Sequence, residues 1–119
     1  MSDRGAYDFF SEGKRLLDER RFLEAVETLE KAVRMEPEKA SIREALARAL
    51  YNSGRTKRAM EEFAATLDLG PADDYAHFGI ALCHARLGNK AAAIGHLKIA
   101  IAMKPDAEPY REALGRLSG

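Results

Sequence analysis

The segment "AIAMKPDA", residues 100–107, reads as an apolar helix end followed by the proline that stops it. Two related segments lie upstream, "AVRMEPEK" at residues 32–39 and "TLDLGPAD" at residues 66–73. Their prolines stand at positions 37, 71 and 105, so both spacings are 34 residues. A proline cannot donate a helical hydrogen bond, and it disfavours helix in the residue before it. The chain therefore ends a helix three times at equal intervals.

The same 34-residue shift aligns other positions without any insertion or deletion. The aligned sets are Ala25, Ala59 and Ala93; Gly13, Ala47, Ala81 and Gly115; and Leu29, Phe63 and Leu97. A small residue lets an antiparallel partner helix approach closely, and a large one fills the space toward the neighbouring pair. Self-similarity at this period indicates stacked helical units.

Each unit contains two helices joined by a tight turn. In the third unit, helical patterns over residues 74–87 and 90–103 flank Gly88, which suits the left-handed conformation that ends a helix. Gly54 has the same place in the second unit, but Arg20 has it in the first. Because a side chain disfavours positive φ, we expect that first turn to be strained or differently shaped.

The last residues begin a fourth unit and stop after one helix. The stretch "AEPYREALGRLSG" has Pro109 near a helix start, with Leu114 and Gly115 in phase with the repeat, and is polar elsewhere. The open end of a stack needs a helix with a polar outer face to cover it. Residues 108–117 are therefore predicted to be a capping helix over the apolar side of the preceding one.

With this period, these small residues and a proline closing each unit, the chain resembles the tetratricopeptide repeat family. The resemblance covers three repeats, 6–39, 40–73 and 74–107, and the capping helix 108–117, in a single domain of residues 1–119. It implies an all-α fold, a right-handed superhelical solenoid of three antiparallel helix pairs plus one capping helix. Function in such a fold depends on the side chains that the scaffold presents.

Composition narrows the function classes. The chain has 119 residues, 46% of them apolar and 32% charged, with no apolar run near the roughly 18 residues of a membrane span. No secretory signal pattern opens the sequence, and a single cysteine rules out an internal disulfide, so we expect a cytoplasmic protein. Nineteen basic and nineteen acidic side chains cancel, which removes the general attraction to nucleic acid or to acidic membranes.

The candidate chemical groups show no pattern typical of a catalytic or metal site. Cys83 and His84 are adjacent and point about 100° apart on a helix, and His77 lies roughly 10 Å from His84 along the axis. We therefore expect no enzyme, cofactor or metal, with a buried Cys83, a half-buried His84 and an exposed His96. A cross-helix site that includes His96 stays open. An enzymatic alternative would need a metal or a nucleophile at His77, Cys83 or His84.

The first helix of each unit carries more apolar surface than stacking requires. In the third unit Tyr75, Phe78 and Leu82 form a second stripe beside Ile80. The resemblance implies that these helices line a concave face that holds an extended peptide or a partner's helix. Carried over by repeat phase, the candidate partner-binding residues are Tyr7, Phe10, Lys14, Arg48, Tyr51, Asn52, Tyr75, Phe78, Leu82 and Arg86.

The predicted groove is aromatic and mildly basic, because its basic residues outnumber Asp18 and Glu44 by one. That character favours a protein or peptide segment with apolar or aromatic anchors and one or two acidic residues, and it is too weak for nucleic acid. Two alternatives remain. Some aromatic side chains, Phe10 and Phe78 before the tyrosines, could instead pack against the next helix. The chain could also be a structural element that self-associates through its stack ends or this stripe.

One subgroup of the family binds a partner's terminal carboxylate through a clamp of lysine, asparagine and arginine side chains. The matching positions here hold Phe10, Lys14, Ala45, Tyr75 and Gly79. The clamp is therefore absent, and an adaptor for chaperone tails is disfavoured.

Overall fold

A computed structural model describes residues 4–119, which form seven α-helices and no strand. The helices are α1 (Ala6–Asp18), α2 (Phe22–Met35), α3 (Ala40–Asn52), α4 (Thr56–Leu69), α5 (Asp74–Arg86), α6 (Lys90–Met103) and α7 (Glu108–Ser118). The predicted all-helical fold of three pairs and a final helix is confirmed. The predicted domain began at residue 1, and residues 1–3 lie outside the described part.

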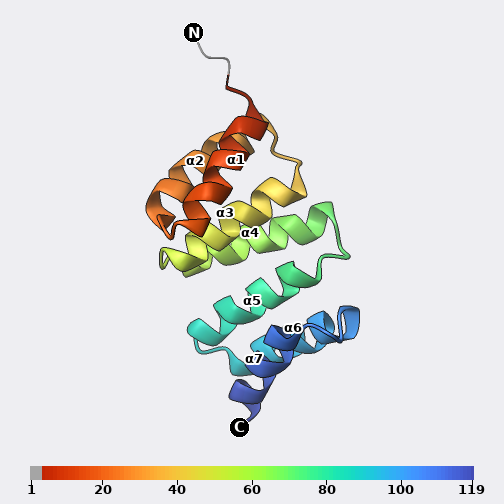
Figure 1. Ribbon diagram of the computed structural model, residues 1–119. Helices are drawn as coiled ribbons and strands as arrows, with labels where there is room; N and C mark the ends of the chain where they lie inside the picture. Colours follow the sequence, from red (N-terminus) through yellow and green to blue (C-terminus); the bar gives the residue numbers. More distant parts are fainter. Residues whose placement is uncertain (1–3) are drawn as a thin grey trace.

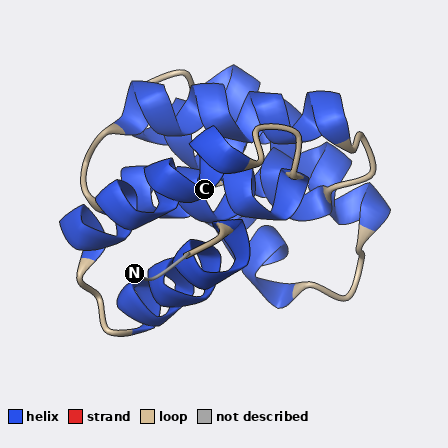
Figure 2. Ribbon diagram, turned by 90° about the horizontal axis from the view of Figure 1, so that it is seen from above, coloured by secondary structure: helices blue, strands red, loops and turns tan. Residues whose placement is uncertain are grey.

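The helices are stacked in chain order along one long axis (Figure 1), within extents of 55 × 25 × 23 Å. Each helix packs mainly against its neighbours in sequence, and α1 also contacts α3, as α3 contacts α5. The first helices of the units therefore lie side by side, and the view from above shows helices joined only by short loops (Figure 2). Within residues 4–119, no helix has the length and apolar character needed to cross a membrane.

Small residues set the helix spacing, as the repeat predicted. Ala25, Ala59 and Ala93 are fully buried. A Cβ added to Gly13 would lie 2.4 Å from the Leu29 side chain, so the glycine is what lets α1 and α2 approach each other.

The large residues of the repeat pack in two different ways. Leu29 fills space against Gly13, inside its own helix pair, whereas Phe63 reaches Gly79 on the next pair. The prediction that this position packs toward the neighbouring pair is therefore confirmed for Phe63. For Leu29 the described contact is within the pair.

The three turns inside the pairs share one shape. The residue in the left-handed region is Arg20 in the first turn, with φ 61°, and Gly54 and Gly88 in the others, with φ 87° and 86°. The amide after each of them donates to the carbonyl five residues earlier, at 2.8–2.9 Å. Arg20 therefore adopts the glycine geometry at the cost of the strain that a β-carbon brings, and the turn is not differently shaped.

The final helix covers the end of the stack. Ala113 is buried together with Ala81, Ala93 and Leu97, and the half-buried Leu114 packs against the same cluster. This is the arrangement predicted for a capping helix.

Candidate functional site

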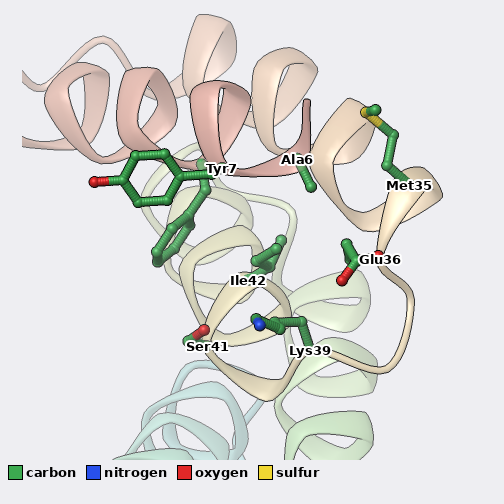
Figure 3. A pocket seen from close by; sticks show the side chains of 8 residues that line it. Ala6, Tyr7, Met35, Glu36, Lys39, Ser41 and Ile42 are labelled. Atoms are coloured by element: carbon green, nitrogen blue, oxygen red, sulfur yellow. The ribbon is translucent and has the colours of Figure 1, made fainter. Parts of the chain in front are cut away.

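An apolar cleft opens where the start of α1, the end of α2 and the start of α3 meet. It has a volume of about 340 Å³, and Figure 3 shows Tyr7 of α1, Met35 of α2 and Ile42 of α3 among the side chains that line it. Tyr7 stands at its edge with 76% of its surface exposed. The lining residues are Ala6, Tyr7, Phe10, Met35, Glu36, Lys39, Ser41 and Ile42.

A second cleft of about 270 Å³ adjoins the first, because Phe10 and Ser41 line both. Its lining is mostly charged, whereas that of the first cleft is mostly apolar. The lining residues are Phe10, Lys14, Asp18, Ser41, Glu44, Ala45 and Arg48. The two clefts together form one depression along α1 and α3, which we call the α1–α3 groove.

Two of the predicted basic residues lie over aromatic rings at this groove. The Lys14 Nζ atom is 4.8 Å from the centroid of the Phe10 ring, and the Arg48 Cζ atom is 5.9 Å from that of Tyr75. A cation over a ring face is attracted by the negative face of the π system. These contacts place Lys14 and Arg48 at the wall of the groove.

Arg86 differs because the fold already uses it. Its Cζ atom lies 3.6 Å from the Tyr51 ring centroid, and its guanidinium donates hydrogen bonds to the Tyr51 carbonyl at 2.8 Å and to the Thr56 hydroxyl at 3.2 Å. Asn52 is similarly engaged, since its amide donates to the Arg48 carbonyl at 2.8 Å. Arg86 thus links α5 to the end of α3 and to the start of α4 by hydrogen bonds.

The predicted stripe on α5 is partly covered. Tyr75 is half-buried, with its ring centroid 6.3 Å from that of Phe63 and 5.9 Å from that of Phe78. Phe78 in turn lies 4.7 Å from the Tyr110 ring on α7, and Leu82 lines a small cleft of about 90 Å³ between α5 and α7. Phe78 therefore follows the alternative in which some of these aromatic side chains pack against another helix.

Sequence reasoning overlooked two carboxylates beside the groove. Asp73 caps the start of α5 and Asp74 is its first residue. Both lie close enough to Glu44 that, after burial, they are the main groups that raise its pKa, to about 8. Arg48 acts in the opposite direction. The signal was available, because first helices stack side by side and the start of α5 must approach α3. Counting these carboxylates makes the groove mixed in charge.

A Glu44→Gln variant is expected to change how stability depends on pH. The folded protein holds a proton on Glu44 up to about pH 8, whereas the unfolded chain loses it near its ordinary pKa. Stability from this group is therefore present at low pH and is lost as pH rises toward 8. The melting temperature of the wild type should fall more steeply than that of Glu44→Gln between about pH 5 and about pH 9. The control is Glu61→Gln, at an exposed residue, which should keep the slope of the wild type. Equal slopes for the wild type and Glu44→Gln would contradict this assignment.

The histidines and the cysteine form no metal centre in the part of the chain that the structure describes. Cys83 is buried, which raises the pKa of its thiol to about 11, and His84 is half-buried, as expected. The expectation of an exposed His96 is wrong, because it is half-buried between helices with its Nδ1 atom 3.1 Å from that of His77. Burial and the two neighbouring imidazoles lower the pKa of His96.

Comparison with known proteins identifies the repeated unit. A family model for the tetratricopeptide repeat matches residues 10–74 and residues 45–108. Superkiller complex protein 3 of Mus musculus is 30% identical over 92 residues, which are 77% of this chain and 6% of that protein. The chain thus spans only a small part of this curated relative.

Solved structures share the fold at low identity. YrrB, a TPR protein with an unusual peptide-binding site, has a TM-score of 0.88 at 24% identity, over 92% of this chain and 57% of that chain. The first TPR of Spaghetti, bound to the HSP90 peptide SRMEEVD, has a TM-score of 0.91 at 14% identity, over 99% and 94%. The Yersinia enterocolitica chaperone SycD, in complex with a peptide of YopD, has a TM-score of 0.81 at 14% identity, over 94% and 86%.

Proposed function

The chain belongs to the tetratricopeptide repeat family, and from this premise we propose a cytoplasmic protein-interaction module that holds an extended segment of a partner in the α1–α3 groove. The observation that carries the proposal is the groove itself, two adjoining clefts of about 340 and 270 Å³ on the first helices of two units. Peptide binding by structures of the same fold, those of SycD and Spaghetti, supports it.

The first two units offer a better site than the third. On α5, the Phe78 ring packs against that of Tyr110, and Arg86 donates hydrogen bonds to a backbone carbonyl and a side-chain hydroxyl of the second unit. On α1, by contrast, Tyr7 is 76% exposed and lines the apolar cleft. A tyrosine with a rigid apolar body and a polar tip is well suited to an interface.

The chemistry of the groove describes its ligand. The apolar cleft suits a side chain without charge, and the charged cleft places Lys14 and Arg48 where they can pair with an acidic residue of the same segment. Asp18 lines the same cleft, and Asp73 and Asp74 lie beside Glu44, so more than one or two acidic residues would be opposed. The one thiol, on Cys83, is buried and its pKa is raised, so it is not placed to act as a nucleophile.

The test uses the partner recovered from the native host with the wild-type chain as bait, followed by calorimetry on the purified pair. Tyr7→Ala should weaken binding by roughly 30-fold, because loss of an aromatic anchor commonly costs about 2 kcal/mol. Arg48→Ala should also weaken binding. Tyr75→Ala is a less specific probe, because Tyr75 also packs against Phe63 and the melting temperature should fall with it.

The control is Glu27→Lys, which changes an exposed residue of α2 outside the groove. It should leave the affinity unchanged. The groove assignment is wrong if Glu27→Lys abolishes binding while Tyr7→Ala and Arg48→Ala have no effect. A stable dimer in light scattering that Tyr7→Ala dissolves would instead support the self-associating element.

A further inference from the structure

One position of the repeat lies at every joint between units. It is the third residue of a first helix, and the 34-residue spacing places Ile42, Ala76 and Tyr110 there. All three side chains are buried, but they differ greatly in size. The joints are therefore filled to different extents by the chain itself.

The third joint shows what such a joint can hold. The Tyr110 ring lies on Phe78 with a centroid distance of 4.7 Å, and its hydroxyl donates to an Asp74 carboxylate oxygen at 2.6 Å. Only 5% of Tyr110 is exposed. An aromatic side chain is thus accommodated between the start of one first helix and the start of the next.

In the first joint the surrounding positions hold matching residues, but the residue at the joint position itself is smaller. By repeat phase Phe10 matches Phe78, Met35 matches Met103, and Ile42 matches Tyr110. The space left is the apolar cleft of about 340 Å³, with Phe10, Met35 and Ile42 in its lining. Figure 3 shows Met35 and Ile42 there. The second joint lacks the aromatic residue, because Glu44 stands there at the position that matches Phe10.

We propose that the apolar cleft binds one aromatic side chain of the partner segment, in the manner of Tyr110, and prefers phenylalanine to tyrosine. This rests on the proposed function and specifies its anchor. The preference follows from Ala6, which stands where Asp74 accepts the tyrosine hydroxyl in the third joint. A buried hydroxyl without an acceptor is costly, whereas a phenylalanine ring needs none. The polar lining residues Glu36, Lys39 and Ser41 are exposed to solvent.

The test is a titration of the full chain with N-acetyl-phenylalanine amide, followed by nuclear magnetic resonance. The amide signals of Phe10, Met35 and Ile42 and the methyl signals of Met35 and Ile42 should shift. The tyrosine amide should bind several-fold more weakly, and the alanine amide should cause no shifts at these residues. Equal shifts with all three probes, or shifts confined to other residues, would overturn the proposal without any variant being needed.

Two variants localise the effect. Met35→Ala should weaken binding of the phenylalanine probe, while Met103→Ala, an exposed methionine at the same repeat position of the filled joint, should not. Ile42→Tyr, which installs the residue of the third joint, should reduce probe affinity by about 10-fold or more while a cooperative melt is retained. Unchanged affinity in both Met35→Ala and a folded Ile42→Tyr would refute the proposal. The proposed function would still stand if Arg48→Ala weakens binding of the partner.

Discussion

Removal of residues 108–119 is expected to give a protein that aggregates and melts at a much lower temperature. These residues supply the buried Tyr110 and Ala113 and the half-buried Leu114 and Leu117. Burial of such side chains contributes on the order of 5 kcal/mol, which is comparable with the whole stability of a small domain. Their loss also exposes Leu97 and Phe78, and a new apolar patch promotes association.

The matched control is removal of residues 118 and 119 alone, which takes away two exposed residues and none of the packing. It should leave the melting temperature and the light-scattering profile of the wild type. If the longer deletion also melts and scatters like the wild type, α7 is an appendage and the capping role assigned to it is wrong.

Gly79→Ala is expected to destabilise the fold strongly for so small a change. The added Cβ would lie 2.4–2.5 Å from three ring atoms of Phe63. Phe63 is 2% exposed and packed in the core, so its ring has little space into which it can move. Overpacking of this kind costs about 1–3 kcal/mol or more, and the gain of about 1 kcal/mol from replacing glycine in a helix offsets only part of it.

Gly95→Ala provides the comparison, because it makes the same change inside α6 with nothing beyond the neighbouring residues and backbone of its own helix within 4 Å of the new Cβ. There only the helix preference acts, and stability should rise by about 0.5–1 kcal/mol. Urea unfolding of both variants measures the difference. Two variants of equal stability would show that the Phe63 ring does not depend on the glycine.

The sequence allowed the fold to be predicted because its strongest signals are local and periodic. The spacing of the prolines predicted where one unit ends and the next begins, and alanines such as Ala59, which are buried in the structure, predicted the close helix contacts. Packing of Phe63 toward the next unit was predicted, but its partner Gly79 was not, because the partner depends on how far one unit is rotated against the next. Arg20 shows a further limit, since the shared turn geometry prevails over its unfavourable backbone preference.

The candidate site was predicted less completely than the fold. Helical phase selected Tyr7, Phe10 and Lys14, which line the groove, but also Phe78, which α7 covers. Phase alone tells which face a residue occupies, and it does not tell which neighbour reaches across to that face. For the same reason the carboxylates that begin α5 were left out of the predicted charge of the groove.

Binding of the partner segment in the α1–α3 groove can be tested by titrating that segment into the isotope-labelled chain and mapping the perturbed backbone signals. We expect the largest perturbations along the two adjoining clefts, at Tyr7, Phe10, Lys14, Ser41 and Arg48. Perturbations confined to exposed residues outside the groove, such as Glu27 on α2 and Glu61 on α4, with the groove signals unmoved, would contradict it.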